Sequence, residues 1–385
     1  MDLAKLGGDR IFFGEDATSA LAGLPSAKKR AFIVMTGTIL EDLGLLKPVT
    51  DALEKGGFKW EKFDKIEEDA TFTTIKKGIE AARKFEPDWI IGFGGGSAMD
   101  AAKTIWVFYE NPEKTELAEV AVPNIIPKLR EKARICCIPT SAGTGSESTR
   151  VAVVKDVDKL QKFVILCMEG RFVPDIAILD PRYSISLPRG LTASTGADAI
   201  THAIESYVCT LSTPYSDGLA ISAFTLAHEY LPKAVENGKD VVAREKMLVA
   251  ANMAGIAFAN SHLGITHSIA HSFGGELGVP HGLANAITLP YIIEFNEADE
   301  KTLKRYRRLA SLVDSKSLLD VVKTLNDKIG IPKGMKDFVK DDSAFEKRFE
   351  SIVSKSISDI CTLGAPRVPT PEQWKALVRL AYYGK

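Results

Sequence analysis

The first half of the chain alternates short apolar runs with segments of helical spacing. Each of the first three runs is followed by a segment in which apolar residues recur every three or four positions. The five runs, each five to seven residues long, lie at 30–35, 60–64, 88–93, 134–139 and 175–181. Runs of this length interleaved with helices are typical of βαβ units. We therefore predict an α/β domain built on a mainly parallel sheet.

From about Leu191 the period of the pattern changes. Apolar residues now recur at three-and-four spacing, with few β-branched runs between them, in segments 194–208, 217–231, 245–261 and 306–313. This spacing predicts amphipathic helices. We expect an all-helical second domain and place the boundary near the LPRG of 187–190, so that the domains are 1–190 and 191–385. No long linker separates them, and we expect the two to pack face to face around a cleft.

Composition restricts the class of partner. Hydrophobic residues make up 45% and charged residues 26% of the chain, and the net charge is -1. This balance gives no attraction to nucleic acid or to an anionic membrane, so a small neutral or modestly charged molecule is the expected partner. The chain has neither a membrane-length apolar stretch nor the apolar region of a signal peptide, which predicts a cytoplasmic protein. The five cysteines contain no C-x-x-C pair, and we expect buried thiols.

A glycine cluster joins the third apolar run to a helical pattern in GFGGGSAMDAAK, residues 92–103. Backbone N–H groups at the start of a helix form an anion site after such a turn. However, Ser97 stands where the G-x-G-x-x-G fingerprint needs glycine, and the Lys-Ser/Thr pair of a phosphate-binding P-loop is absent. By itself, the segment fits a phosphate site and a plain turn equally well.

A second glycine-rich turn, PTSAGTGSES at 139–148, follows the fourth run. Its hydroxyl side chains, Thr140, Ser141, Thr144 and Ser146, could donate hydrogen bonds to a cofactor amide or phosphate. An ordinary loop has the same composition, and both interpretations stay open from the residues alone.

All six histidines lie between 202 and 281. Asp198 and His202 stand four apart in a helical segment, which places both side chains on one face. His267 and His271 repeat this spacing, and His281 follows. One carboxylate and several imidazoles on facing helices suit iron(II), zinc, cobalt or nickel.

An isolated histidine is more often a satisfied core or surface residue than a metal ligand. This is the interpretation we prefer for His228, beside Glu229 in an amphipathic segment, and for His262. The two i, i+4 pairs together with His281 favour a metal site over that alternative. A nucleotide in the first domain and a metal in the second would indicate redox chemistry.

The motifs, taken together and in order, identify a family. GGGSAMDAAK, IPTSAGTGSE, STGADAITHAIESYV, LGITHSIAHSFGG and PHGLANAITLPY resemble the iron-dependent (group III) alcohol dehydrogenases. The likeness runs from about residue 12 to about residue 365, and within the family it is most similar to the NADPH-dependent butanol dehydrogenases. It implies a Rossmann-like dinucleotide-binding domain followed by an all-helical domain, the fold shared with dehydroquinate synthase.

The resemblance assigns the residues of the second domain one by one. The metal ligands of the family match Asp198, His202, His267 and His281. His271 is therefore not among the implied ligands. In the family, the residue at His271 lies beside the nicotinamide and relays a proton. Phe258 matches an aromatic residue that lines the substrate pocket. The implied metal is Fe2+, with Zn2+ as the alternative.

The resemblance also implies which residues bind the dinucleotide. Residues 95–97 match the loop that binds the pyrophosphate, and the turn after the fourth run matches the loop on the nicotinamide side. Lys162 matches a lysine that contacts the cofactor ribose, and Leu179 matches an apolar residue that packs on the cofactor. The complete set of implied cofactor residues is Gly37, Thr38, Gly95, Gly96, Ser97, Asp100, Thr140, Ser141, Thr144, Lys162 and Leu179.

Three positions depart from the family pattern. Gly37 stands where NAD-preferring members carry an aspartate, and since that carboxylate would repel a 2'-phosphate, we expect NADP(H) to be preferred and NAD(H) to be usable. Arg150 lies near the expected pocket mouth; it would bind an anionic substrate group or be paired within its loop. The family's NPR reads APR at 365–367, which weakens inferences about that loop.

These residues predict a metal-dependent alcohol dehydrogenase or aldehyde reductase acting on a small primary alcohol or aldehyde of the butanol type. The alternatives are a reductase of an anionic semialdehyde or phosphonate aldehyde that uses Arg150, a glycerol dehydrogenase-like or dehydroquinate synthase-like enzyme, and a non-catalytic nucleotide-binding or metal-storage protein. The family default is a homodimer.

Overall fold

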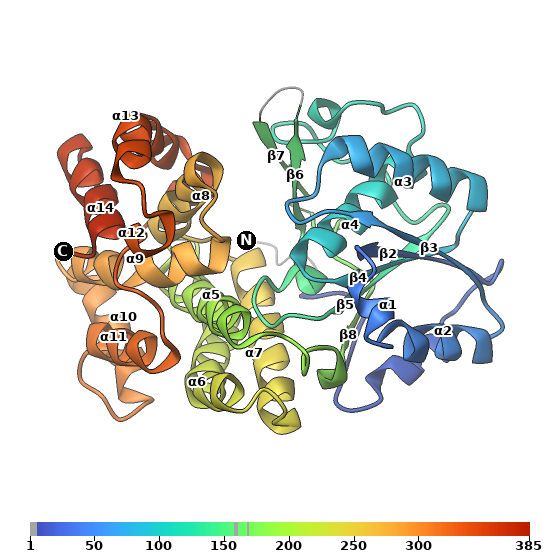
Figure 1. The fold of residues 1–385 in the computed structure, drawn as a ribbon, viewed down its shortest axis with the longest axis horizontal. Coiled ribbons are helices and arrows are strands. Elements are labelled where there is room, and N and C mark those ends of the chain that lie inside the picture. Colours follow the sequence, from blue (N-terminus) through green and yellow to red (C-terminus); the bar gives the residue numbers. More distant parts are fainter. Residues whose placement is uncertain (1–5, 158–160, 168) are drawn as a thin grey trace. The chain divides into compact units, whose positions relative to one another are not determined.

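The structure is a computed structural model that describes residues 6–157, 161–167 and 169–385, apart from the side chain of residue 161. It divides into two compact units, Met1–Ser186 and Leu187–Lys385. Figure 1 shows the first unit in blue to green and the second in green to red. The boundary predicted after residue 190 falls inside the first helix of the second unit, Arg189–Val208.

The first unit contains the predicted parallel sheet. Within the described residues it has six strands in the order β1-β8-β5-β4-β2-β3, and every neighbouring pair is parallel. The strands are β1 (Arg10–Phe13), β2 (Arg30–Thr36), β3 (Lys59–Ile66), β4 (Trp89–Gly94), β5 (Arg134–Pro139) and β8 (Ile176–Leu179). All five predicted runs are strands of this sheet, which confirms the α/β fold class.

The sequence pattern missed β1 and a separate antiparallel hairpin, β6 (Val151–Asp156) and β7 (Gln161–Leu166). β1 has four residues, none of them buried, and its apolar run of three residues, 11–13, is shorter than the runs that predicted the other strands. Strand β6 alternates buried and more exposed positions, and its pattern is that of a strand covered on one face.

Both faces of the sheet are covered. Along β2, Phe32 and Val34 enter one core and Ala31, Ile33 and Met35 enter the other, as the two-residue period of a strand requires. The first core is completed by α3 (Phe72–Phe85) and α4 (Gly96–Glu110), and the second by η1 (Ala17–Gly23), α1 (Ile39–Asp42) and α2 (Leu46–Lys55). The remaining short helices are η2 (Leu117–Glu119), η3 (Ser146–Ser148) and η4 (Pro181–Tyr183).

The strand order reverses at β2. The chain passes from β2 outward to β3 and then returns to β4 on the other side of β2. In an open parallel sheet, ligands bind beyond the carboxyl ends of the strands at this point of reversal. The segments that follow β2 and β4 are those containing Gly37 and residues 95–97, so the topology brings two predicted cofactor segments to one edge.

The second unit is helical throughout its described residues, as predicted. Its long helices are α5 (Arg189–Val208), α6 (Pro214–Glu236), α7 (Val241–Ala259), α8 (Ile265–Leu277), α9 (His281–Asn296), α10 (Glu300–Ser311), α11 (Leu318–Ile329), α13 (Asp342–Ser358) and α14 (Pro371–Tyr383), with short α12 (Lys336–Val339) and η5 (Ile360–Gly364). Helix α5 packs against α6, α7 and α9, and α8 packs against α9 and α13.

Two further sequence expectations can be compared with the structure. All five cysteines are buried free thiols, as predicted. None of the helices in the described part of the chain is both long enough and apolar enough to span a bilayer.

Candidate functional site

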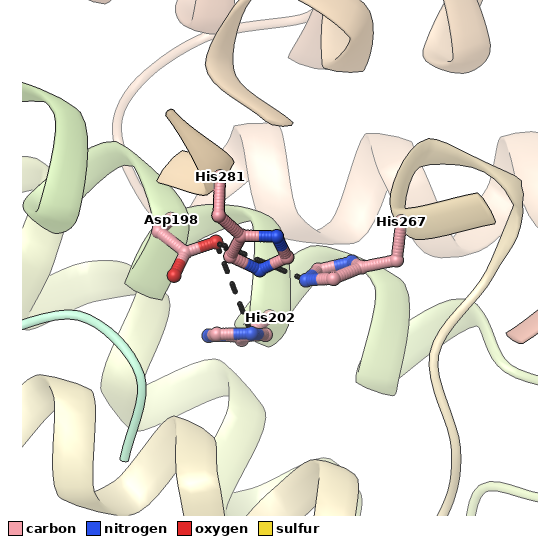
Figure 2. Close-up of side chains that lie close together, drawn as sticks. All are labelled: Asp198, His202, His267 and His281. Carbon is pink, nitrogen blue, oxygen red and sulfur yellow. Dashed lines mark ion pairs between the residues drawn. The ribbon is translucent and has the colours of Figure 1, made fainter. Parts of the chain in front are cut away.

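Three helices bring four potential metal ligands together in the second unit. Asp198 and His202 lie one turn apart on α5, His267 lies on α8, and His281 is the first residue of α9. From Asp198 Oδ1 the imidazole Nε2 atoms lie at 3.9 Å (His202), 3.8 Å (His267) and 3.6 Å (His281). Figure 2 shows the four side chains converging on one point. All four ligand atoms lie within 4.8 Å of one another.

Burial and neighbouring charges set the protonation states of these ligands. Burial raises the pKa of Asp198, but His202, His281, His267 and a hydrogen bond from Asn285 lower it below its ordinary value. Burial also lowers the pKa of His267 well below its usual range, and the neighbouring imidazoles lower it further. The carboxylate is therefore ionised and the His267 ring neutral, the forms in which these groups bind metals.

The geometry fits a divalent transition metal. One oxygen and three nitrogens at this spacing can surround an ion at the usual ligand distances of about 2.0 to 2.2 Å. The donor set suits iron(II) or zinc, because imidazole and carboxylate are ligands that both ions accept.

Two residues that the sequence analysis missed contact the ligands. Asn285 Nδ2 lies 2.8 Å from Asp198 Oδ1 and 3.1 Å from Nε2 of both His267 and His281. The Glu205 carboxylate lies 2.6 Å from His267 Nδ1. Spacing could have indicated both, since Asn285 follows His281 by four residues and Glu205 follows Asp198 by seven on the same helix.

His271 lies beside the ligand set without belonging to it. Its ring stacks on that of His281 with centroids 5.2 Å apart, and its Nδ1 lies 2.9 Å from Asp359 Oδ2. Burial raises the pKa of Asp359, but the hydrogen bond and the charge of His271 lower it to about 2. The side chain of His271 is 38% exposed, unlike the buried His202 and His267. Its role as a proton relay stays a prediction.

Phe258 lies against the ligand set as well. Its ring stacks on that of His202, with centroids 4.6 Å apart and an angle of 29° between the planes. Phe258 comes from α7, which packs against α5. This position agrees with an apolar wall beside the metal ligands, and its contact with a substrate stays a prediction.

In the first unit, the two glycine-rich turns pack against each other. Residues 95–97 form the first turn of α4, and Thr140 N donates to Gly94 O over 3.0 Å. A Cβ at Gly96 would lie 3.0 Å from Thr144 Cγ2. The contact between the two turns thus leaves little room for a side chain at 96. An anion bound by the backbone N–H groups at the start of this 15-residue helix stays a prediction.

Asp100 has a different environment from the one expected of a cofactor contact. Its Oδ1 accepts from Ser146 Oγ at 2.6 Å and its Oδ2 from Val153 N at 2.9 Å. Both carboxylate oxygens are therefore used inside the protein. Asp100 thus supports the turn after β5, and its contact with a cofactor stays a prediction.

The other predicted residues of the first unit lie as follows. Lys162 Nζ pairs with Asp69 Oδ1 at 2.5 Å, and Asp69 N donates to Ser97 Oγ at 3.2 Å, so Lys162 is linked to the first turn of α4. Leu179 is buried at the end of β8. Arg150 is half-buried, and burial lowers the pKa of its guanidinium. Contacts of these side chains with a ligand stay predictions.

Replacing Lys103 with methionine is expected to destabilise the protein by about 3 kcal/mol, the size of a broken buried charge pair. The ammonium group is 0% exposed and donates to Ser146 Oγ, Thr149 O and Val151 O at 2.9 to 3.0 Å. Methionine leaves these three acceptors without their donor and removes the positive charge that lowers the pKa of the buried Asp100 carboxyl. Denaturant unfolding measures this loss of stability, and a change below about 1 kcal/mol would contradict the prediction. The control is Lys77→Met at an exposed position, whose free energy of unfolding should stay within about 0.5 kcal/mol of the wild type.

Comparison with known proteins covers both units. A family model described as iron-containing alcohol dehydrogenase matches residues 8–181, and one described as Fe-containing alcohol dehydrogenase family, C-terminal, matches residues 192–382. The chain is 38% identical to the NADPH-dependent butanol dehydrogenase of Clostridium saccharobutylicum, over 97% of this chain and 96% of that protein.

Solved structures show the same architecture. The iron-containing alcohol dehydrogenase of Thermococcus thioreducens has a TM-score of 0.91 at 32% identity, over 98% of this chain and 99% of that one. Sulfoacetaldehyde reductase of Bifidobacterium kashiwanohense, solved in complex with NAD+, has a TM-score of 0.87 at 26% identity and covers 100% of both chains.

Proposed function

The chain belongs to the iron-containing alcohol dehydrogenase family, and we propose that it interconverts small primary alcohols and aldehydes of the butanol type, using NADP(H) and Fe2+. The observation that carries the proposal is the convergence of Asp198, His202, His267 and His281, with His271 stacked beside them. An oxidoreductase of this class needs a Lewis-acid site and a proton-transfer group next to each other.

The metal and the nicotinamide would supply the reacting groups, and the side chains of the protein would hold these groups in place. When bound, the metal provides Lewis acidity toward a substrate oxygen, and the nicotinamide provides or accepts the hydride. Asp198 and the three histidines would hold the ion. The helices that carry them are packed together, since α9 packs on both α5 and α8, which fixes the positions of the ligand side chains. Phe258 covers the His202 ring and gives the site an apolar wall.

His271 is the proposed proton carrier. In the proposed arrangement its Nδ1 donates to the Asp359 carboxylate, which leaves Nε2 to exchange a proton with the substrate side. Its partial exposure allows exchange of that proton with solvent. A carboxylate that orients the ring and stabilises its charged form is the usual arrangement for an imidazole in acid–base catalysis.

Gly37→Asp is expected to shift preference from NADPH toward NADH. Gly37 has φ 57°, and a Cβ there would meet no atom of the described residues within 4 Å. Aspartate is among the residues that tolerate this backbone region, so the variant should fold. Two like charges about 4 Å apart repel by roughly 1 to 4 kcal/mol, which predicts a loss of about fivefold or more in kcat/KM for NADPH.

The matched control is Gly37→Asn, which has the shape of the aspartate variant without its charge. It should keep most of the NADPH preference of the wild type. An unchanged ratio of kcat/KM for the two cofactors in Gly37→Asp would contradict a 2'-phosphate site at this segment.

The function is tested by a substrate panel assayed with NADH and NADPH, on chelator-treated protein and on protein reloaded with Fe2+ or Zn2+. Butanal and propanal should be reduced best, with NADPH, and only after metal is restored. A preference for sulfoacetaldehyde or succinate semialdehyde would favour an anionic substrate bound by Arg150 instead. No NADPH oxidation with any aldehyde in the reloaded protein would contradict the proposal.

A further inference from the structure

We propose that Glu205 is a positioning residue of the metal site: its carboxylate holds the His267 ring so that Nδ1 carries the proton and Nε2 is free for the metal. This inference rests on the proposed function, because it concerns the same ligand set. Glu205 Oε2 lies 2.6 Å from His267 Nδ1, and His267 Nε2 is the atom that lies 3.8 Å from Asp198 Oδ1. The two ring nitrogens therefore face different partners.

Glu205 accepts a second hydrogen bond that fixes its own position. Thr266 N donates to Glu205 Oε1 over 2.8 Å, one of the N–H groups in the first turn of α8 that has no acceptor within its helix. A carboxylate at the start of a helix also interacts favourably with the helix dipole. One side chain of α5 thus anchors both the start of α8 and the ring of its ligand His267.

The chemistry of the carboxylate selects the tautomer. Burial raises the pKa of Glu205, whereas the hydrogen bonds from Thr266 and from Gly264 N lower it. In its ionised form the carboxylate has acceptors only, so the ring nitrogen that faces it carries the proton. The remaining nitrogen then presents its lone pair on the side of Asp198 and the other ligands. Metal-bound histidines commonly donate their second N–H to a carboxylate in this way, which fixes the ring orientation and raises the affinity for the metal.

The local sequence makes room for this contact. A Cβ at Gly264 would lie 2.8 Å from Glu205 Oε1 and 3.2 Å from its Cδ, so a side chain at this position would displace the carboxylate. Gly264 is also the residue that precedes α8. The close approach of α5 to the start of α8 therefore depends on a residue without a side chain.

Glu205 is too enclosed to contact a substrate. It is 4% exposed, and the cavity it lines has a volume of about 10 Å³, enough for a single water molecule at most. Any effect of Glu205 on activity must therefore act through His267 and the metal. This distinguishes it from His271, whose ring is partly exposed.

Glu205→Gln tests the inference, because glutamine has the same shape but one of its two terminal groups is a donor. It cannot accept hydrogen bonds from Thr266 N and His267 Nδ1 at once. Its amide would then favour the His267 tautomer with the proton on Nε2. We expect the affinity for Zn2+ or Co2+, measured by chelator competition on the metal-free protein, to fall about 10- to 100-fold.

A second measurement separates positioning from general damage. Absorption spectra of the cobalt-loaded protein report the ligand geometry and should change in Glu205→Gln, while circular dichroism of the metal-free protein stays that of the wild type. The control is Glu229→Gln, an exposed carboxylate paired with Lys233 on α6, which should change neither affinity nor spectrum. Wild-type affinity and an unaltered cobalt spectrum in Glu205→Gln would overturn the inference.

If Glu205→Gln does not fold, Glu205→Asp takes its place in the same measurements. Aspartate keeps the acceptor oxygens but withdraws them by one methylene from His267, so the same loss of metal affinity is expected, and wild-type affinity would overturn the inference. Failure of the proposed function has a different signature. In that case the wild type itself would reduce no aldehyde, whatever the affinity of the Glu205 variants for metal.

Discussion

The double variant His267→Ala, His281→Ala is expected to bind no stoichiometric metal and to lose about a thousandfold or more in kcat/KM, the size of a loss of several kcal/mol of charge stabilisation. It retains Asp198 and His202, one oxygen and one nitrogen on a single helix. Two ligands are fewer than the three or four protein ligands that catalytic and structural sites of this kind use. Elemental analysis of the purified protein gives the metal content.

His228→Ala is the matched control for this variant. His228 is a partly buried histidine of the same unit, on α6, and it lies outside the group of four ligand atoms. Metal content and activity should stay those of the wild type. One equivalent of metal in the double variant would show that the ion is held elsewhere and that the assignment of the ligands is wrong.

The sequence predicted the pairs within a helix better than the contacts between helices. The i, i+4 spacing placed Asp198 with His202 on one face, and the structure has them so. The same spacing placed His271 with His267, and only the family resemblance separated them. In the structure His271 turns to Asp359, 88 residues away, a contact that no local pattern reveals.

The sequence predicted those strands of the sheet that are buried along most of their length. Strands β4 and β5 lie in the middle of the sheet and are buried along nearly their whole length, so their residues form unbroken apolar runs. The edge strand β1 has only three apolar residues, 11–13, and the β6–β7 hairpin contains the short apolar runs 151–154 and 163–166 but is buried at only some of its positions. The environment of Asp100 was also hidden, because its partners Ser146 and Val153 come from segments that reach α4 only in the folded chain.

His271→Ala is expected to slow turnover by about 10²- to 10⁴-fold, the contribution of a positioned acid–base group. Metal content should remain that of the wild type, since the four ligand atoms lie within 4.8 Å of one another without His271. The pair of measurements distinguishes a proton carrier from a ligand: loss of metal in this variant would place His271 in the first coordination sphere and contradict its proposed role.

Added imidazole provides the decisive test of that role. Removing the His271 side chain leaves space next to the His281 ring, on which it stacks, and close to the Asp359 carboxylate that faces its Nδ1. Free imidazole bound there would carry the proton in place of the missing side chain, so the rate should rise with its concentration and then saturate. His262→Ala, which removes an imidazole outside the four-ligand group, should lose little activity and gain none from imidazole. A His271→Ala enzyme that imidazole leaves unchanged, with its metal retained, would favour a packing role for this ring over proton transfer.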